Sequence, residues 1–308
     1  MEIREATTDV ELEALLAVRN AVFREDPLAL AEIRARESQV KQVLHLVAWE
    51  HDRPVGAGDV GLLFQSPEPF AHTWVLPEER RRGIGSALYD TVSQWAREHA
   101  KDVIEVWVED AEPDGIRFVQ NRGFEQIGRE LHVSLDLTQI DAPSVEAPDG
   151  VTITTWAERP ELIHGLYEVA LEAFPDIPGD EDNELESFED WLAHEMDAGP
   201  GDRKDATFVA LAGQEVVGYS KFSLTAAQPR VAHHDLTGVK RAWRRRGIAR
   251  ALKQAQIAWA KQAGYEELRT RNEERNEPIR RLNQEFGYRP SGGRSLFRGP
   301  LARAASDT

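Results

Sequence analysis

The chain contains no cysteine, and this absence excludes disulfide bridges and thiolate metal sites. It also lacks any apolar run approaching the roughly 20 residues of a membrane-spanning helix. Residues 1–5 are charged and lead directly into patterned sequence, so we expect no signal peptide. These absences predict a soluble, cytoplasmic protein. The histidines show no convincing ligand spacing, so we expect no metal site.

Positive charge is scarce, with 37 Lys and Arg against 54 Asp and Glu, a formal net charge of −17. This field would repel a long polyanion, so nucleic acid is not an expected partner. A cationic amine is compatible with it, although the acidity can equally serve solubility alone. Segment 180–197 has nine acidic residues and no Lys or Arg. It is either a helix that receives an amine or a solvated helix face.

One strand–loop–helix pattern occurs twice. Val75 followed by Arg-Arg-Arg-Gly-Ile-Gly at 80–85 recurs 164 positions later as Val239 followed by Arg-Arg-Arg-Gly-Ile-Ala at 244–249. The register holds without a gap from the arginines to Gly123-Phe124 and Gly287-Tyr288. A constant register over about fifty residues indicates a duplicated folding unit.

The stretch 138–149 lacks helical or strand periodicity and contains two prolines, so it is the best domain boundary. We therefore expect an N-terminal domain at 1–138, a linker at 139–149 and a C-terminal domain at 150–308. In each copy a strand and a helix precede a hairpin, a further strand, the Arg/Gly loop and a long amphipathic helix. This order predicts two α/β (α+β) domains, each with a mixed sheet flanked by helices.

The loop before each long helix has the composition of an anion-binding site. Glycine or alanine leaves the first helical turn uncovered, where unpaired N–H groups and the helix dipole attract anions. The three preceding arginines add charged donors for phosphate oxygens. A single such string could be a solvated turn, but its recurrence in the same context favours phosphate binding. The candidate residues are Arg80, Arg81, Arg82, Gly83, Ile84, Gly85 and Ser86, and Arg244, Arg245, Arg246, Gly247, Ile248, Ala249 and Arg250.

Neither loop carries the Gly-x-Gly-x-x-Gly of a dinucleotide-binding fold or the Gly-Lys-Ser/Thr of a Walker A motif. The pattern Arg-x-x-Gly-x-Gly/Ala after a strand, with Asn276 and Gly287-Tyr288 downstream, instead resembles the GCN5-related N-acetyltransferases (GNAT). The resemblance covers nearly the whole chain as a tandem pair, similar in layout to the type that includes mycothiol synthase.

The resemblance implies a largely antiparallel, splayed sheet whose fourth and fifth strands part to admit the pantetheine of acetyl-CoA. It further implies that the loop amides of residues 245–250 hold the pyrophosphate and that the strand ending at Val239 pairs with pantetheine. Asn276 resembles the family's cofactor-contacting Asn. Val75 and the first loop are the corresponding candidates in the first copy.

Transfer of an acetyl group to an amine needs a proton acceptor and a polarised thioester carbonyl. His233 occupies the strand position where many family members carry a carboxylate base, and an imidazole exchanges protons near neutral pH. Strand alternation predicts that His233, Asp235, Thr237 and Val239 share one face, with Asp235 orienting His233. The Val239 N–H would polarise the carbonyl. A purely structural role for the two histidines at 233–234 stays open.

The second copy is the predicted catalytic one. The first copy has Pro69 where the second has His233, and Glu112 where the second has Asn276. The first domain then either binds acetyl-CoA or serves as a scaffold. Many family members carry a Tyr general acid where this chain has Asn283; a thiol has a pKa near 8.5, so its thiolate leaves without obligatory protonation. Asn283 could donate a weak hydrogen bond, and Tyr219 or Tyr288 could substitute.

The sequence therefore predicts an acetyl-CoA-dependent N-acetyltransferase in which a small primary amine attacks the thioester directly in a ternary complex. Two alternatives stay open: a non-catalytic acyl-CoA-binding module, and a transferase acting on protein N-termini or lysines. The expected assembly is a pseudo-symmetric monomer or a homodimer.

Overall fold

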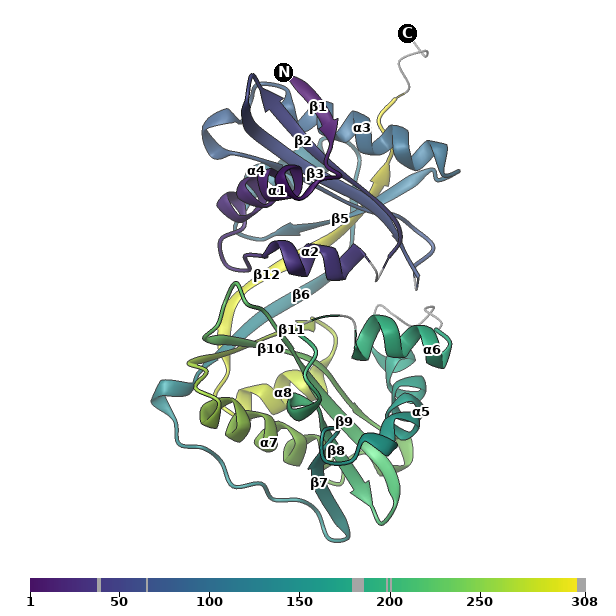
Figure 1. Ribbon diagram of the computed structural model, residues 1–308, viewed down its shortest axis with the longest axis vertical. Coiled ribbons are helices and arrows are strands. Elements are labelled where there is room, and N and C mark those ends of the chain that lie inside the picture. Colours follow the sequence, from purple (N-terminus) through teal and green to yellow (C-terminus); the bar gives the residue numbers. More distant parts are fainter. Residues whose placement is uncertain (38–39, 65, 179–185, 198, 200, 304–308) are drawn as a thin grey trace. The chain divides into compact units, whose positions relative to one another are not determined.

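The computed structural model describes residues 1–37, 40–64, 66–178, 186–197, 199 and 201–303. They divide into two compact units. Unit 1 comprises Met1–Arg129 and the described residues from Arg294 onward, and unit 2 comprises Glu130–Gly293. Figure 1 shows the elements of each unit.

Unit 1 is built on a mixed sheet in the strand order β1-β2-β3-β4-β5-β12. All neighbours are antiparallel except β4 and β5, which are parallel. Its strands and helices are β1 (Glu2–Glu5), α1 (Asp9–Val22), α2 (Leu30–Glu37), β2 (Val40–Glu50), β3 (Arg53–Leu63), β4 (Phe70–Val75), α3 (Ile84–Glu98), β5 (Val103–Glu109), α4 (Pro113–Gln120) and β12 (Arg289–Pro300).

Unit 2 repeats this plan in the strand order β6-β11-β10-β9-β8-β7. Here the parallel pair is β10 and β11. Its strands and helices are β6 (Glu125–Asp136), β7 (Val151–Thr155), α5 (Ile163–Ala173), α6 (Phe188–Trp191), β8 (Phe208–Ala212), β9 (Glu215–Leu224), β10 (Val231–Val239), α7 (Ile248–Gln262), β11 (Glu267–Glu273) and α8 (Glu277–Glu285).

Each sheet is covered on both faces. In unit 1, one apolar core joins the sheet to α3 and α4 around Leu88 and Val92, and a second core joins it to α1 and α2 around Leu12 and Ile33. In unit 2, α7 and α8 cover one face, and α5 and α6 cover the other (Figure 1). The predicted stripe on each long helix explains this, since residues spaced by three and four lie on one helix face. The predicted fold class is confirmed.

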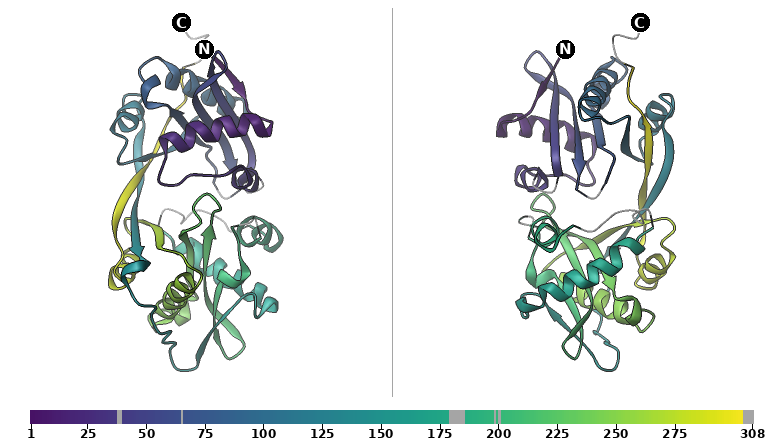
Figure 2. Two further views of the ribbon diagram at one scale, coloured as in Figure 1. Left: turned by 60° about the vertical axis from the view of Figure 1, so that its left-hand side comes forward. Right: turned by 90° about the vertical axis from the view of Figure 1, so that its right-hand side faces the viewer.

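The sixth strand of each sheet comes from the other half of the sequence. Arg294–Pro300 of β12 pairs with Val103–Glu109 of β5 in unit 1. Glu130–Asp136 of β6 pairs with Glu267–Glu273 of β11 in unit 2. β12 is the yellow strand in Figure 2, and it pairs with β5. Each compact unit therefore contains one strand from the other half of the sequence. The predicted boundaries, with domains at 1–138 and 150–308 joined by a linker at 139–149, concern the two copies of the repeat and stay a prediction.

The predicted linker lies against α7. The N–H of Glu146 donates to Gln254 Oε1 at 2.9 Å, and Lys261 Nζ donates to the carbonyls of Leu137 and Ile140. No helix in the described part of the chain is long and apolar enough to cross a membrane.

The strand exchange predicts that core substitutions destabilise the unit to which they contribute, not the half of the sequence in which they lie. Phe297, in β12, is buried in the core of unit 1. Phe297→Ala should cost about 3–5 kcal/mol and raise hydrogen exchange first in β5. Leu135→Ala, in β6, is the reciprocal variant, with a cost of about 2–5 kcal/mol appearing in β10 and β11. Exchange that follows sequence halves instead would contradict the assignment.

Candidate functional site

The parallel strands of each unit part soon after they begin to pair. In unit 1 the register between β4 and β5 is limited to Phe70 opposite Glu105. In unit 2 it covers Val231, Ala232 and His233 opposite Glu267, Leu268 and Arg269. Beyond these points β4 runs to Val75 and β10 to Val239 without a partner on that side in the described structure. The predicted splay of the sheets is present in both copies.

The last residue of each parted strand presents its backbone N–H to the gap. Leu76 N donates to Val55 O on β3, and Lys240 N donates to Val217 O on β9. Because successive N–H groups of a strand point to opposite edges, those of Val75 and Val239 face the other way. The carbonyl on the same side is already bonded, to Arg80 Nε at 3.3 Å and to Arg244 Nε at 2.9 Å.

The two Arg/Gly loops have the same backbone conformation. Arg81 (φ 65°) and Arg245 (φ 61°) are left-handed, as are Gly83 (φ 85°) and Gly247 (φ 90°). A left-handed non-glycine residue is strained by about 1–3 kcal/mol and persists only where its surroundings enforce it. Because the same strained conformation occurs at the matching position of both copies, we infer that the surrounding structure determines the shape of the loop.

Each loop delivers an uncapped helix N-terminus. Gly83 precedes α3 and Gly247 precedes α7, and no side chain caps either helix. The first intrahelical bonds are made by the N–H groups of Ala87 and Ala251. The earlier amides are therefore available to an anion, with the positive end of the helix dipole behind them. These amides belong to Ile84, Gly85 and Ser86, and to Ile248, Ala249 and Arg250.

The three arginines of the first loop are not equivalent. Arg80 is also held by Glu112 at 3.1 Å, and Arg82 is paired with Glu50 at 2.6 Å and with Glu79. In the described structure Arg81 is exposed and has no carboxylate partner. Arg122, which sequence reasoning missed, adds a cation beside the loop: it donates to the Ser86 hydroxyl at 2.7 Å and stacks on Phe118.

The second loop follows the same scheme with different partners. Arg244 pairs with Asp176 at 2.6 Å, and hydrogen bonds from Arg241 and then Arg244 lower the pKa of that carboxyl to about 2. Arg246 lies over the Trp243 ring at 4.8 Å, and Arg250 pairs with Glu285. Arg245 is exposed, with no carboxylate partner in the part of the chain that the structure describes.

The outer sides of the loops differ. A Cβ added at Gly247 would lie 3.6 Å from Pro148 of the predicted linker, whereas one added at Gly83 would have no described neighbour within 4 Å. The linker thus reaches the second loop, and the first loop is more open.

A bulge corrects the predicted face of the strand before the second loop. The register between β10 and β9 shifts between His234 and Thr237. Val239 packs in the core beneath α7, whereas Leu236 packs in the core beneath α5. The prediction that His233, Asp235, Thr237 and Val239 share one face is therefore wrong, because an extra residue in the strand reverses the alternation.

His233 and Asp235 have separate partners. His233 lies opposite Ser223 on β9, and its Nε2 contacts Gln228 Oε1 at 3.1 Å. Asp235 forms an ion pair with Lys221 Nζ at 3.1 Å. Burial lowers the pKa of Lys221, but the charges of Asp235, Asp202 and Glu195 outweigh burial and raise it above its ordinary value. Asp235 therefore neutralises a buried lysine, and its role as an orienting partner of His233 stays a prediction.

The amide side chains predicted near the cofactor occupy different settings. Asn276 caps α8 by position, without a side-chain hydrogen bond to the helix. Asn283 is buried: its Nδ2 donates to Asn272 Oδ1 at 2.8 Å, and its Oδ1 has no partner among the described residues. One of the two N–H donors of Asn283 is thus bonded to Asn272, and a carboxamide has no acidic proton to give to a thiolate, so Asn283 could offer only a hydrogen bond. In the first copy, Val119 is part of the apolar core at this position.

A buried polar cluster between β10 and α7 was not predicted. His234 Nδ1 contacts Gln256 Oε1 at 3.1 Å, and its Nε2 contacts the Tyr288 hydroxyl at 2.5 Å. Burial lowers the pKa of His234 well below its ordinary value, so its neutral ring accepts the Tyr288 proton. Lys253 Nζ lies 5.4 Å from the Tyr288 ring centroid. Tyr288 is therefore committed to His234.

Two further expectations concern the acidic segment 180–197 and metal binding. In segment 180–197, residues 180–185 lie outside the described residues. In the described remainder, Trp191 packs against α5 while Glu189 and Asp190 are exposed, the arrangement of a solvated helix face. Within the described ranges, no group of three or more His, Asp or Glu side chains is arranged to hold a metal ion.

Two parted mixed sheets, each with the same Arg/Gly loop and an uncapped helix after the parted strand, define a tandem fold in which one domain plan occurs twice. The family model described as Acetyltransferase (GNAT) family matches residues 12–124 and 163–288. The chain therefore belongs to the GNAT family, as the resemblance predicted.

Relatives agree with this placement. Mycothiol acetyltransferase of Catenulispora acidiphila is 31% identical over 153 residues, 49% of this chain and 46% of that protein. The chain thus spans about half the length of this curated relative. A tandem GNAT protein from the clavulanic acid biosynthesis pathway has a TM-score of 0.79 at 20% identity, covering 98% of this chain and 99% of that one. A GCN5-related N-acetyltransferase from Sphaerobacter thermophilus has a TM-score of 0.75 at 20% identity, covering 98% and 96%. These two structures show the shared fold.

The buried lysine of the second unit generates a prediction about pH. Burial lowers the pKa of Lys253 to about 7, whereas an unfolded lysine has a pKa of about 10.4. Between these values the unfolded chain binds the additional proton, so the stability of the wild type rises with pH across this window. Lys253→Met removes the buried ammonium. It should therefore be more stable than the wild type by a few kcal/mol at pH 7 and lose this advantage toward pH 10, by up to about 1.4 kcal/mol per pH unit.

Denaturant unfolding of both proteins at several pH values measures this difference. Lys261→Met is the matched reference. It makes the same substitution on the same helix, but the Lys261 ammonium donates a hydrogen bond to the carbonyl of Leu137 at 2.7 Å. A gap between wild type and Lys253→Met that is constant with pH would show that Lys253 does not titrate in this range.

Proposed function

We propose that the protein is an acetyl-CoA-dependent N-acetyltransferase that transfers the acetyl group to a primary amine by direct attack. The observation that carries the proposal is the same in both units: a parallel strand pair parts immediately before an uncapped helix with a left-handed Arg/Gly loop. An extended amide-containing chain ending in phosphates suits this combination of a free strand edge and an anion site.

The residues present suit each part of the donor. The pyrophosphate would receive the free amides of the first helical turn, Ile84–Ser86 or 248–250, together with the exposed guanidinium of Arg81 or Arg245. The pantetheine arm, an extended chain with two amides, would accept from the N–H of Val75 or Val239 at the parted edge. Arg80 and Arg244 would act by holding the end of the strand, since their guanidinium groups already bond its carbonyl.

In unit 2, the backbone N–H that would polarise the thioester carbonyl lies close to the bulge in β10, and it is not that of Val239. His233 and Val239 are six residues apart, roughly 20 Å along an extended strand. One acetyl group cannot contact both. Thr237, whose N–H faces the same edge as that of Val239, is about 13 Å from His233 along the strand. We therefore assign the carbonyl contact to Thr237 N–H, with His233 accepting the amine proton through a chain of water molecules.

The acceptor would approach from the α5 and α6 face. Gln228, His233 and the partly exposed Asp235 contribute polar groups there, and the ion-paired Lys221 is buried behind Asp235. Asp202 pairs with the same lysine at 3.1 Å, so two carboxylates share one ammonium. This excess of negative charge favours a cationic amine, in keeping with the net charge of the chain.

The loop assignment is tested by titrating acetyl-CoA into variants that reverse the exposed cation of each loop. Arg245→Glu should lower affinity at the second site by at least tenfold, and Arg81→Glu should do the same at the first, because a carboxylate would face the pyrophosphate. Both positions are already left-handed with a non-glycine residue. The substitution therefore changes the charge with little change in backbone strain.

Gly247→Glu should abolish binding at the second site, but it combines repulsion with the strain of a side chain at φ 90°. Gly247→Ala, which adds the strain alone, separates the two causes. Unchanged affinity in Arg245→Glu and Gly247→Glu would refute the second loop as a cofactor site, and absence of any binding by the wild type would refute the acetyltransferase proposal.

The proton acceptor of unit 2 is tested in the Arg81→Glu background, in which donor binding at unit 1 is weakened at least tenfold. His233→Ala should lower the turnover of acetyl-CoA with a panel of small primary amines by about 10²-fold and leave acetyl-CoA affinity unchanged. Asp205→Ala is the matched control, because Asp205 pairs at the surface with Arg203 and should leave turnover unaltered. Full activity of His233→Ala would return His233 to a structural role. Acetylated peptides without turnover of small amines would instead indicate a protein acceptor.

A further inference from the structure

Three polar side chains cross the sheet of unit 1 in a single row. His45 on β2 lies opposite Asp59 on β3, and Asp59 lies opposite His72 on β4. Side chains of directly opposite residues share a face and are within contact distance. Asp59 Oδ1 contacts His72 Nδ1 at 2.7 Å. The row lies on the α1 face, because the neighbouring Trp74 packs in the core that α1 forms.

The His72–Asp59 pair has the geometry of an oriented base. A carboxylate oxygen accepts hydrogen bonds, so this contact orients the His72 ring with Nδ1 as the donor toward Asp59 and Nε2 directed away from it. The His72 side chain is 31% exposed and that of Asp59 is 15% exposed. The His72 ring is further held between Phe70 and Trp74, with its centroid 5.4 Å from that of Trp74 and the planes inclined by 10°. The imidazole is therefore fixed in tautomer and orientation but remains accessible.

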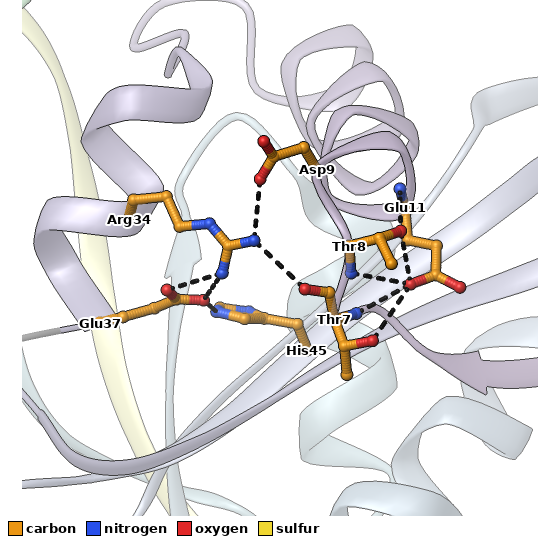
Figure 3. Close-up of polar contacts among 7 residues, drawn as sticks. All are labelled: Thr7, Thr8, Asp9, Glu11, Arg34, Glu37 and His45. Atoms are coloured by element: carbon orange, nitrogen blue, oxygen red, sulfur yellow. Dashed lines mark hydrogen bonds and ion pairs between the residues drawn. The ribbon is translucent and has the colours of Figure 1, made fainter.

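The far end of the row is anchored to the helices. His45 Nε2 lies 3.4 Å from Glu37, whose carboxylate also pairs with Arg34 at 3.0 Å. Arg34 in turn pairs with Asp9 at the N-terminus of α1, which the Thr8–Glu11 capping box holds (Figure 3). These contacts run from His45 on β2 through α2 to the start of α1.

His72 lies where the acyl group of a bound donor would lie. The pairing of β4 with β5 ends at Phe70, two residues before His72. Leu76 N points to β3, so the N–H groups of Thr73 and Val75 face the gap. Thr73 adjoins His72 in the chain, whereas Thr237 lies four positions after His233 in unit 2. Unit 1 thus brings an imidazole closer to the free strand edge than unit 2 does.

We propose that unit 1 is a second acetyl-transfer centre, with His72 as its general base and Asp59 as the residue that positions His72. The proposal rests on the acetyl-CoA binding proposed above. His72 Nε2 takes one proton from the acceptor ammonium, and the nitrogen lone pair forms the C–N bond with the thioester carbon. The C–S bond breaks, and the second N–H proton passes to the thiolate, so coenzyme A leaves as the thiol. The imidazolium returns its proton to solvent.

The location of His72 is tested without knowledge of the acceptor, by acylating histidines with diethyl pyrocarbonate in the full chain. The Arg245→Glu/Arg246→Glu variant confines acetyl-CoA to unit 1. Saturating acetyl-CoA should slow modification of His72 at least tenfold, as read by peptide mass spectrometry. His51, exposed in the turn between β2 and β3, is the internal control and should react at the same rate with and without acetyl-CoA. Equal rates at His72 with and without bound acetyl-CoA would overturn the proposal.

Turnover in the same background tests the chemistry. The probes are water, measured as release of coenzyme A from acetyl-CoA, and 2-phenylethylamine, chosen because aromatic rings flank His72. His72→Ala should lower kcat by about 10²-fold without changing KM for acetyl-CoA. Asp59→Asn should lower kcat by tenfold or more at constant KM, and Asp59→Glu should restore part of it, since a merely structural role would not separate kcat from KM in this way. No measurable turnover in the background variant, or full kcat in His72→Ala, would overturn the second centre.

These outcomes separate the inference from the proposed function. If calorimetry shows that the Arg245→Glu/Arg246→Glu variant binds no acetyl-CoA while the wild type binds one equivalent, unit 1 has no donor site and the second centre fails, but the acetyltransferase proposal stands. If the wild type binds none, both fail. Circular dichroism and the thermal midpoint of His72→Ala establish that a loss of kcat is not a loss of fold; His72→Gln, closer in size and polarity, provides the same test if the alanine variant is unstable.

Discussion

The separation of two parallel strands is the feature on which the proposed chemistry depends. A strand edge is normally satisfied by its neighbour, because unpaired backbone N–H and C=O groups are costly to bury. In unit 1, β4 and β5 are in register at one residue pair, and in unit 2, β10 and β11 are in register at three. The freed edge continues to Val75 and Val239. In the proposed function an extended ligand pairs with this edge, and the helix that follows provides the proposed anion site at the far end of that ligand.

Comparison of the two Arg/Gly loops distinguishes the arginine that holds the loop in place from the arginine that is exposed. In both copies the first arginine bonds the carbonyl of the strand end and pairs with a carboxylate, Glu112 for Arg80 and Asp176 for Arg244. The middle arginine is left-handed and exposed in both copies. The carboxylates come from different elements, yet the outcome is the same. This supports a division of labour in which the first arginine holds the loop and the second remains available for a ligand.

The two units differ in the polar groups around their gaps. In unit 2 a bulge in β10 follows His234, and Asp235 pairs with a buried lysine. In unit 1 the continuous β4 aligns His72 with Asp59 across an unbroken ladder. Sequence comparison of the copies favoured unit 2, because it has histidines where unit 1 has Pro69 and Phe70. In unit 1 the proposed base is His72, and the equivalent position in unit 2 is Leu236.

The sequence by itself determined the elements, the duplication and the loops. Apolar residues spaced by three and four define α3 and α7, and glycine at 83 and 247 supports the turn into each helix, since these are local properties of the chain. Only the tertiary structure decided which strands complete each sheet, on which face His233 lies, and that Asp59 meets His72. A single extra residue in a strand reverses its alternation, and register between strands depends on pairing between distant segments. The alternation that wrongly placed His233 with Val239 failed for this reason. An acid at 59 within an otherwise apolar and glycine-rich strand was the one local sign of the His72 pair, and its meaning depended on the strand beside it.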